Sequence, residues 1–294
     1  MTHQRVVITG ANGFIGSFLA ESLSPHHKVL AVGRKASTLP QGVLQIVCNA
    51  LDDPSPLKTV LSEGDLVVHL ACSTFPAISE INPAKDIAEN VLGSEKLLRI
   101  CLDKNISKFI FLSSGGAVYG NGLAPKKETD PLRPQSTYGR IKVAIEELVV
   151  ASGLPYLILR PSNVYGRRKV EQNQLLGVVD VFLRKITEGE TIKVIGDGKN
   201  TRDYLYIMDL VQFMIHSLNR TGIYNVGTGI GVSLNEVVHV IETVTGKKAQ
   251  TEYLPARETD VRANVLDVSK AKATDWSPST TLEKGIWAMS RRSV

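Results

Sequence analysis

The sequence predicts an α/β protein with a doubly wound parallel sheet, followed by a smaller mixed α/β domain in the C-terminal part of the chain. Three observations lead to this prediction. Continuous apolar runs alternate with helical patterns from residue 6 to residue 160, a glycine-rich turn joins the first run to the first helix, and the composition changes after Gly166. Apolar strands separated by helices are typical of a parallel sheet that helices cover on both faces.

The first part of the chain supplies the elements of that sheet. Each strand is expected from a short apolar run and each helix from apolar residues at helical spacing. The expected strands are 6–8, 28–33, 44–48, 66–71, 108–113 and 156–160. The expected helices are 14–23, 57–62, about 84–103 and about 136–151.

We expect residues 1–166 to form the sheet domain, with a segment near 207–230 returning to it. Residues 167–206 and 231–294 would form the second domain, with helices at about 175–188 and 233–245 and a strand at 192–195. Ser233 is a good N-cap and Glu236 stands at the capping-box position. In doubly wound sheets ligands bind at the carboxyl ends of the strands, so the second domain is expected there.

Composition excludes several classes of protein. Hydrophobic residues make up 43% and charged residues 21% of the 294, as in ordinary globular proteins. The net charge of +5 suits small anions, and no basic run interleaved with aromatic residues predicts a nucleic-acid partner. Cys48, Cys72 and Cys101 are isolated and the six histidines lack ligand spacing, so we expect neither disulfides nor a metal. With no signal-peptide pattern and no membrane-spanning run, a cytoplasmic protein without a membrane partner is expected.

The stretch T-G-A-N-G-F-I-G at residues 9–16 predicts a dinucleotide site. Its spacing is G-x-x-G-x-x-G, between a buried strand and a helix N-terminus, where backbone N–H groups and the helix dipole favour a diphosphate over residues 12–15. Gly10 permits the tight turn, Gly13 lets the backbone approach phosphate, and Gly16 packs the helix on the strand.

The end of the second strand bears on the type of dinucleotide. An acid there would bind the adenosine ribose, whereas an arginine favours a 2′-phosphate. The sequence is Val32-Gly33-Arg34-Lys35, which has no acid. Arg34 is therefore a candidate phosphate partner, although Arg34 and Lys35 are equally compatible with a solvated loop. Both NAD and NADP stay open as cofactors.

Tyr138 and Lys142 are four residues apart on an expected helix, so phenol and ammonium lie on one face. A free tyrosine has a pKa of about 10, and a neighbouring ammonium and a cationic nicotinamide ring would each lower it. Tyr138 could then exchange a proton with a substrate hydroxyl while hydride passes to the nicotinamide. An exposed tyrosine beside a solvated lysine is the alternative, but the pair follows a strand that ends in Ser113 and Ser114.

In combination these features resemble the extended short-chain dehydrogenase/reductase family, in its NAD-dependent epimerase/dehydratase branch, and are most similar to UDP-glucose 4-epimerase-type enzymes. The resemblance implies a Rossmann fold and runs through nearly the whole chain. Its motifs are 9–16, V-V-H-L-A at 67–71, N-V-L-G at 90–93, S-S-G-G-A-V-Y-G at 113–120, Y-G-R-I-K at 138–142, L-R-P-S-N-V-Y-G at 159–166, G-D-G at 196–198, T-R-D-Y at 201–204 and D-V-S-K-A at 267–271.

The resemblance implies the roles of the catalytic residues. Tyr138 is the acid/base, and Lys142 orients the nicotinamide ribose and lowers the Tyr138 pKa. The family's third residue, a serine or threonine, falls on Gly115. Ser114 is the neighbouring hydroxyl, and strand alternation would direct it elsewhere unless Gly115 and Gly116 allow a bend.

The resemblance also implies two binding sets, with two departures at the cofactor: Gly33 and Asn49 stand where acids are common. In the substrate set, arginines suit phosphate because they bond it in bidentate fashion; for Arg202 an ion pair with Asp203 or Asp209 is the alternative. The cofactor set is Gly10, Asn12, Gly13, Phe14, Ile15, Gly16, Arg34, Asn49, Leu70, Ala71, Asn90, Ser113, Tyr138 and Lys142. The substrate set is Thr74, Ser114, Asn163, Arg202 and Arg257.

Three functions follow. The first is a nucleotide-sugar epimerase, working on a UDP-hexose or UDP-N-acetylhexosamine through a 4-keto sugar and regenerating its cofactor. The second is an NADPH-dependent reductase of nucleotide 4-keto-6-deoxy sugars, while a dehydratase lacks its carboxylates at 116–117. The third is a dinucleotide-sensing or RNA-binding protein, which Tyr138 and Lys142 disfavour.

A homodimer is expected because the helices at about 84–103 and 136–151 pair across subunits in similar enzymes. Their apolar residues also suit core packing. These residues are Val91, Leu97, Leu98, Ile145 and Leu148.

Overall fold

The computed structural model describes residues 4–74, 79–121, 125–167, 177–256 and 262–291. The chain forms two compact units. The first comprises Met1–Tyr119, Pro131–Arg160 and Val211–Tyr224, and the second Gly120–Asp130, Pro161–Leu210 and Asn225–Val294. A return of the chain to the first unit after residue 206 was expected, whereas the assignment of Gly120–Asp130 to the second unit was not.

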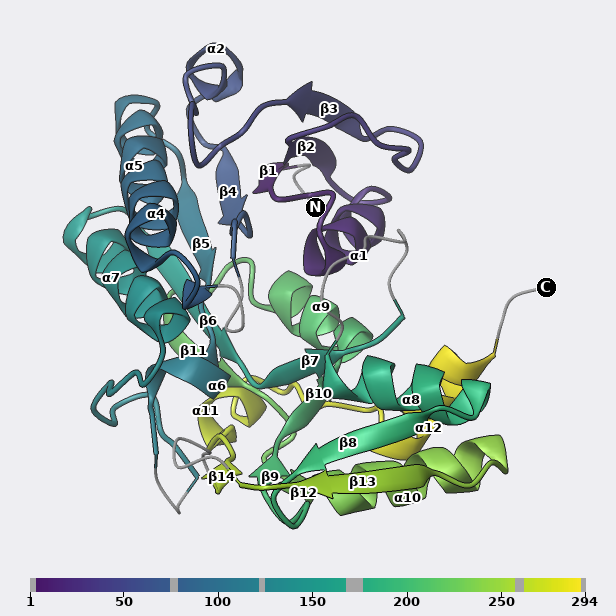
Figure 1. Ribbon diagram of the computed structural model, residues 1–294. Helices are drawn as coiled ribbons and strands as arrows, with labels where there is room; N and C mark the ends of the chain where they lie inside the picture. The colour runs from purple at the N-terminus through teal and green to yellow at the C-terminus, as the bar shows by residue number, and fades with distance from the viewer. Residues whose placement is uncertain (1–3, 75–78, 122–124, 168–176, 257–261, 292–294) are drawn as a thin grey trace. The chain divides into compact units, whose positions relative to one another are not determined.

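The first unit is built on a seven-stranded sheet in the order β3-β2-β1-β4-β5-β6-β11 (Figure 1). The pairs from β3 to β6 are all parallel. The order 3-2-1-4-5-6 is that of a dinucleotide-binding sheet, so the predicted doubly wound fold is confirmed. The strands are β1 Arg5–Thr9, β2 Lys28–Gly33, β3 Leu44–Val47, β4 Leu66–His69, β5 Lys108–Leu112, β6 Tyr156–Pro161 and β11 Gly222–Val226.

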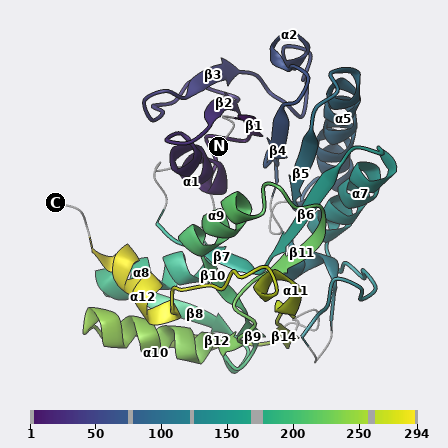
Figure 2. The same ribbon diagram turned by 180° about the vertical axis from the view of Figure 1, so that it is seen from behind.

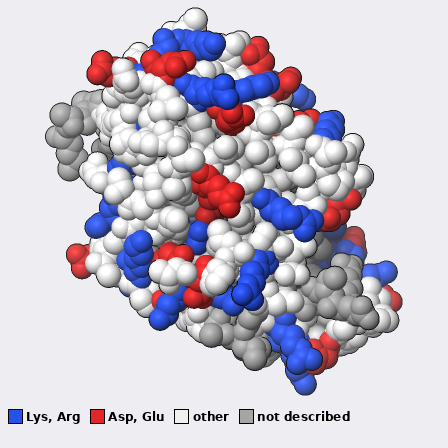
Figure 3. Space-filling model, turned by 90° about the vertical axis from the view of Figure 1, so that its left-hand side faces the viewer, with Lys and Arg blue, Asp and Glu red and all other residues white. Residues whose placement is uncertain are grey.

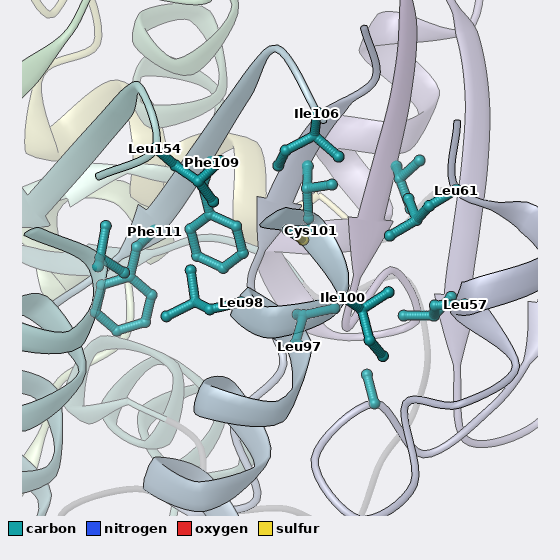
Figure 4. Close-up of a cluster of buried hydrophobic side chains, with 14 of the residues drawn as sticks. Leu57, Leu61, Leu97, Leu98, Ile100, Cys101, Ile106, Phe109, Phe111 and Leu154 are labelled. Carbon is teal, nitrogen blue, oxygen red and sulfur yellow. The ribbon is translucent and has the colours of Figure 1, made fainter. Parts of the chain in front are cut away.

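Helices cover both faces of this sheet. Figures 1 and 2 show α5 (Gly93–Asp103) and α7 (Thr137–Ala151) on one side and α1 (Phe14–Leu23) and α9 (Ile207–His216) on the other. Under α5 lies a buried apolar cluster in which Leu97 and Leu98 pack against Phe109 and Phe111 of β5 (Figure 4). Each such side chain contributes about 1.5–3 kcal/mol by leaving water. The short helices α2 (Leu57–Val60) and α6 (Gly115–Val118) complete the unit.

The helix expected at about 84–103 is three consecutive pieces. These are α4 (Pro83–Ile87), a π-helical turn η1 (Ala88–Leu92) and α5. The Asn82 side chain caps α4 by accepting from the Lys85 N–H at 3.2 Å. At the start of α5 a Cβ on Gly93 would overlap the Leu51 carbonyl, so glycine lets the helix approach that loop. The apolar pattern continues through the π turn, so it did not predict the break.

Three strands and one helix are shorter than expected. β3, β4 and β5 end at Val47, His69 and Leu112, one or two residues before the predicted ends, and α2 ends at Val60. Just past these ends the Cys48, Leu70 and Ser113 N–H groups still donate to backbone carbonyls of the neighbouring strands, at Gly33, Thr9 and Leu159. Ser113 thus still bonds to β6, whereas Ser114, the next residue, is the N-cap of α6.

The second unit has small sheets and three longer helices. The pairs are β7 (Asn163–Tyr165) with β10 (Tyr204–Tyr206), β8 (Thr191–Ile195) with β13 (Gln250–Leu254), and β9 (Thr201–Arg202) between β12 (Val232–Ser233) and β14 (Ala263–Asn264). The longer helices are α8 (Val178–Glu188), α10 (Leu234–Thr245) and α12 (Leu282–Ser290), and α11 (Ser269–Lys272) is a short one. The predicted capping box between Ser233 and Glu236 is present. The part of the α8 prediction before residue 177 lies outside the described residues.

Two kinds of feature are absent from the part of the chain that the structure describes. No described helix combines the length and apolarity needed to cross a membrane. No group of three or more His, Cys, Asp and Glu side chains that could hold a metal ion lies among the described residues.

Candidate active site and cofactor site

The glycine turn after β1 needs glycine at two positions for reasons of backbone geometry. Gly10 has φ +74°, and a Cβ on it would lie 2.7 Å from the Ala71 nitrogen. A Cβ on Gly16 would overlap the Gly10 carbonyl oxygen. Gly13 is different, because its Cβ would only approach that oxygen at 3.1 Å. Gly10 and Gly16 therefore shape the turn, and Gly13 keeps its surface open.

The N-terminus of α1 fits a diphosphate. Gly13 is its N-cap, and no side chain of the described residues caps it. The first N–H groups of a helix have no partner within the helix, and at α1 these include the N–H groups of Ile15 and Gly16. A phosphate group supplies the acceptors and the negative charge that this end of the dipole favours.

The Asn12 side chain lies beside Gly33, where the family resemblance implies an acid. Its Nδ2 donates to the Lys35 carbonyl at 2.6 Å, and its Oδ1 accepts from the Ser37 hydroxyl at 2.8 Å. A Cβ on Gly33 would lie 2.7 Å from the Asn12 Nδ2. An acid at position 33 would therefore displace Asn12. The predicted cofactor residue Asn12 thus uses its side chain to hold the loop after β2, while Arg34 on that loop is exposed.

A buried histidine joins the ends of β1 and β4. His69 Nδ1 lies 2.7 Å from the Thr9 hydroxyl, and its Nε2 lies 3.0 Å from the Ser94 hydroxyl. Because Ser94 uses its proton to donate to the Asn90 carbonyl, Nε2 must be the protonated nitrogen and Nδ1 must accept from Thr9. Burial, with a smaller effect of Lys142, lowers the pKa of His69 to about 3, so the ring is neutral. Sequence reasoning missed this residue because a lone histidine carries no spacing signal.

Asn90, in the π turn η1, holds the loop that follows β4. Its Oδ1 accepts from the Ser73 N–H at 3.0 Å, and its Nδ2 donates to the Ser73 hydroxyl and the Asp86 carbonyl, both at 2.8 Å. The amide that was predicted to bind cofactor is thus engaged with protein groups. In that loop the Leu70 N–H donates to the Thr9 carbonyl, and the Ala71 N–H to the Thr9 hydroxyl.

Two other predicted residues lie near these loops. Asn49 is exposed, and its Oδ1 accepts from the Leu51 N–H at 3.4 Å. Thr74 is buried, and its carbonyl accepts from the Cys72 thiol at 3.2 Å.

Side chains satisfy the N-terminus of α7, which carries Tyr138. The Thr137 N–H donates to a Glu80 carboxylate oxygen at 2.6 Å, the Tyr138 N–H to the Ser79 hydroxyl at 3.2 Å, and the Gly139 N–H to the Ser136 hydroxyl at 3.1 Å. A carboxylate at a helix N-terminus also interacts favourably with the dipole. These bonds fix the first turn of α7, where Tyr138 lies.

Lys142 is buried one turn further along α7 and is held by the end of β5. Its Nζ donates to the Leu112 carbonyl at 2.9 Å and lies 5.6 Å from the centre of the Tyr138 ring. Burial alone lowers the pKa of Lys142, but Cys72, Tyr138 and Glu146 raise it overall, so the ammonium is retained. A fixed positive charge therefore lies beside the phenol.

Ser114 lies close to Tyr138, contrary to the expectation from strand alternation. Ser114 has φ −153° and ψ 104° and is the N-cap of α6, so it stands past the end of β5 at a change of direction. Burial raises the pKa of Tyr138, while Lys142 and a hydrogen bond with the Ser114 side chain lower it. The glycines at 115 and 116 lie within α6, which provides the bend. Tyr138, Lys142 and Ser114 are thus brought together in the first unit.

The predicted substrate residues Asn163 and Arg202 belong to the second unit. The Asn163 N–H and Nδ2 both donate to the Asp203 carbonyl, at 2.9 and 3.1 Å. The Asp203 carboxylate accepts from the Thr228 N–H, the Thr228 hydroxyl and the Gly229 N–H. The Asp203 carboxylate is thus bonded by the loop at 228–229.

The other alternative partner of Arg202, Asp209, is also engaged, since it accepts from Ser279 and Thr280. Arg202 itself donates from Nη1 to the Thr201 carbonyl at 2.9 Å. Arg257 lies outside the described residues.

Comparison with known proteins identifies the family. The family model described as the NAD dependent epimerase/dehydratase family matches residues 6–227. The chain belongs to this family. The family resemblance predicted from the motifs is confirmed, and the protein is an enzyme that uses a nicotinamide dinucleotide, NAD or NADP.

Individual relatives match along nearly the whole chain. A putative UDP-glucose 4-epimerase of Methanocaldococcus jannaschii is 32% identical, over 96% of this chain and 95% of the relative. A dTDP-4-dehydro-6-deoxyglucose reductase of Escherichia coli is 33% identical, over 96% and 95%. The crystal structure of a Thermotoga maritima UDP-glucose 4-epimerase with UDP-glucose superposes with a TM-score of 0.88, at 32% identity and 97% coverage of both chains.

Proposed function

We propose that this protein is a nucleotide-sugar 4-epimerase acting on a UDP-hexose or a UDP-N-acetylhexosamine. The observation that carries the proposal is the cluster of Tyr138, Lys142 and Ser114, formed where β5 ends and α7 begins. Similar proteins with epimerase activity, one of them crystallised with UDP-glucose, support the substrate class.

In this proposal Tyr138 handles the proton. Its phenolate form accepts the proton of the sugar C4 hydroxyl, and the phenol later returns it to the C4 oxygen. Lys142 stabilises the phenolate, and Ser114 hydrogen-bonds the C4 oxygen in place of the hydroxyl that Gly115 lacks. The bound dinucleotide, held over residues 12–15, supplies hydride acceptance and return. Since burial raises the Tyr138 pKa in the protein alone, Lys142 is required for the phenolate to form near neutral pH.

The nucleotide diphosphate of the substrate is assigned to Asn163, Arg202 and Arg257, with Thr74 and Ser114 toward the sugar. Arg202 suits this role because a guanidinium makes two parallel bonds to phosphate. Asp203, between β9 and β10, accepts from Asn163 with its carbonyl and from the loop at 228–229 with its carboxylate, and so links Asn163 to the segment that carries Arg202.

A second candidate function is the NADPH-dependent reduction of a nucleotide 4-keto-6-deoxy sugar. Two observations favour it: the similarity to a reductase, and the loop after β2, where Gly33 is followed by the exposed Arg34. The chemistry uses the same tyrosine and lysine but consumes the reduced cofactor.

One experiment separates the two functions. Purified protein is incubated with UDP-glucose, with UDP-N-acetylglucosamine and with a nucleotide 4-keto-6-deoxy sugar, each with and without NADPH. Epimerised product without net cofactor use is the expected result. Stoichiometric NADPH oxidation with the keto sugar alone would replace the epimerase assignment by the reductase.

We also propose a homodimer, formed through α4, η1 and α7. Ile87, Leu92 and Val150 on these elements are 45–51% exposed. The apolar residues first considered for this contact are instead core: Leu97, Leu98 and Ile145 are buried, and Val91 and Leu148 pack against the same cluster. Figure 3, which views the side of α4, α5 and α7, shows uncharged surface between groups of charged side chains.

Light scattering tests the homodimer. A dimer mass at micromolar concentration is expected, and Leu92→Glu should give the monomer, whereas a monomeric wild type would refute the dimer.

We further propose a cytoplasmic location, because all three cysteines are unpaired, as is usual in a reducing compartment.

A further inference from the structure

A buried ionic network lies behind the end of β5, and the proposed reaction does not use it directly. Arg160 of β6 donates from Nε to both Glu146 carboxylate oxygens, at 3.0 and 3.1 Å, and from Nη2 to Oε2 at 2.5 Å. The Ser113 hydroxyl donates to Glu146 Oε1. Arg160 Nη1 donates to the Tyr119 hydroxyl at 2.8 Å. The Arg160 and Glu146 side chains are only 3% and 4% exposed.

The network is in register with the proposed catalytic residues. Tyr138, Lys142 and Glu146 are spaced four residues apart, so they form one stripe along α7. Each contacts one of three consecutive residues at the end of β5. Ser114 bonds to Tyr138, the Leu112 carbonyl to Lys142, and the Ser113 hydroxyl to Glu146. The strand end and the helix are therefore joined at three successive points, two of which belong to the proposed site.

Stability alone does not account for the buried ion pair between Arg160 and Glu146. Removing two charges from water costs several kcal/mol per ion, and well-packed apolar residues often replace such a pair with no loss of stability. Apolar residues would not, however, provide a hydrogen-bond acceptor with a fixed orientation. The Glu146 carboxylate, fixed by three bonds from Arg160, presents one oxygen to Ser113 and thereby sets the backbone from which Ser114 projects.

We propose that Glu146, held by Arg160, is a positioning residue for the reaction proposed above. It fixes Ser113, so that Ser114 and the Leu112 carbonyl meet Tyr138 and Lys142, and its negative charge lies on the stripe beside the Lys142 ammonium. The proposal rests on the epimerase function only for the rate measurements. The titration of Tyr138 tests it separately.

Three variants test this inference. Ser113→Ala removes the link between strand and carboxylate but keeps the ion pair. The double variant Glu146→Leu/Arg160→Met removes both charges together, which avoids leaving one buried and unpaired. The control is Asp65→Asn. Asp65 forms a bidentate pair with Arg5, at 2.7 and 2.6 Å, where β1 and β4 begin, at the other end of the same sheet.

The first readout is kinetic. Both test variants should fold and keep the wild-type KM for the UDP-sugar, while kcat falls by about ten-fold or more, since small misplacements at a reacting centre can cost as much as about 10²-fold. Asp65→Asn should lower the melting temperature and leave kcat unchanged. If the double variant or Ser113→Ala folds and retains full kcat, the positioning role is refuted and the pair is merely structural.

The second readout needs no turnover. The ζ carbon of Tyr138, observed by NMR in protein labelled at tyrosine and assigned with Tyr138→Phe, is titrated with NAD present. In Ser113→Ala the Ser114 hydrogen bond is misdirected, so the apparent pKa of Tyr138 should rise, with no change in Asp65→Asn. An unchanged titration in Ser113→Ala refutes the inference even if no UDP-sugar is a substrate. An absence of wild-type turnover together with the expected pKa rise would overturn the proposed function and not the positioning.

Discussion

Lys142 lies one helical turn beyond Tyr138 on α7, and its ammonium lies 5.6 Å from the centre of the phenol ring while it donates to the Leu112 carbonyl at 2.9 Å. The strand therefore holds the cation in place, and the helix sets its distance from the phenol. Burial raises the pKa of Tyr138 and Lys142 opposes this effect. Formation of the Tyr138 phenolate near neutral pH therefore depends on the Lys142 ammonium. We expect loss of either side chain to lower the rate of the proposed reaction.

Tyr138→Phe removes the proton acceptor and keeps the ring. We expect turnover to fall by roughly 10²–10⁴, the usual contribution of one positioned acid/base, with dinucleotide and UDP-sugar still bound. Steady-state assays and calorimetry measure the two effects. Lys142→Ala is the companion variant and should reduce both the rate and the dinucleotide affinity. Full activity of Tyr138→Phe on a verified substrate would show that the mechanism is wrong.

Ser114→Ala tests whether this hydroxyl replaces the one lost at Gly115. A hydrogen bond to a charged group contributes about 1.5–3 kcal/mol, so its loss should lower kcat by roughly ten-fold to a hundred-fold. The pH–rate profile should move to higher pH, because the bond with Ser114 lowers the pKa of Tyr138. Thr74→Ala is the comparison. A larger loss there than in Ser114→Ala would transfer the role to Thr74.

The glycine turn predicts two different outcomes for the same substitution. In Gly16→Ala the new Cβ overlaps the Gly10 carbonyl, so the protein should be destabilised. In Gly13→Ala the new Cβ has 3.1 Å to that oxygen, so the fold should be retained while dinucleotide affinity falls. Melting curves with and without NAD separate the two. Unchanged NAD affinity in a folded Gly13→Ala or Gly13→Val protein would refute the assigned diphosphate site.

Arg34 provides a test of cofactor type. It is exposed on the loop after β2, which Asn12 holds, and it lies next to a glycine in place of an acid. Arg34→Ala should weaken NADP more than NAD, because only NADP carries the 2′-phosphate. Lys28→Ala, at the exposed start of the same strand, is the control and should affect neither. Equal losses of affinity for NAD and NADP in Arg34→Ala would show that Arg34 does not bind the 2′-phosphate and is only a solvated charge of the loop.

The fold was largely predictable because its strands are continuous apolar runs and its turns are marked by glycine. The shared helix face of Tyr138 and Lys142 was also predictable, since a spacing of four is a local property of a helix. The position of Ser114 was not predictable in this way. It depends on the chain turning into α6 at Ser114, a change of direction that the apolar pattern of β5 does not signal.

Other errors also come from contacts between distant segments. The Asn12 carboxamide lies against Gly33, so the missing acid and the asparagine are one feature, although they stand 21 residues apart in the sequence. The π turn at Asn90 preserves the apolar pattern, so the sequence predicted one continuous helix. The apolar residues of α5 and α7 were ambiguous between core and interface, and only packing decided that Leu97, Leu98 and Ile145 are core.

His69 gives the last prediction, a pH dependence of stability. Burial lowers its pKa from 6.5 to about 3, so the unfolded chain takes up this proton near pH 6.5 and the native protein only near pH 3. Between these values the unfolded state binds more protons, and the free energy of unfolding falls as the pH falls. At pH 5 the loss from this group is about 2 kcal/mol relative to pH 7.

His69→Gln removes the titrating group, so it should be less stable than wild type at pH 7 but lose about 2 kcal/mol less on going to pH 5. Urea unfolding at the two pH values measures this, with His239→Gln on the exposed side of α10 as the control that keeps the wild-type loss. An identical pH 7 to pH 5 loss in wild type and His69→Gln would mean that His69 is protonated in the native protein and that its bonds to Thr9 and Ser94 are not those of a neutral ring.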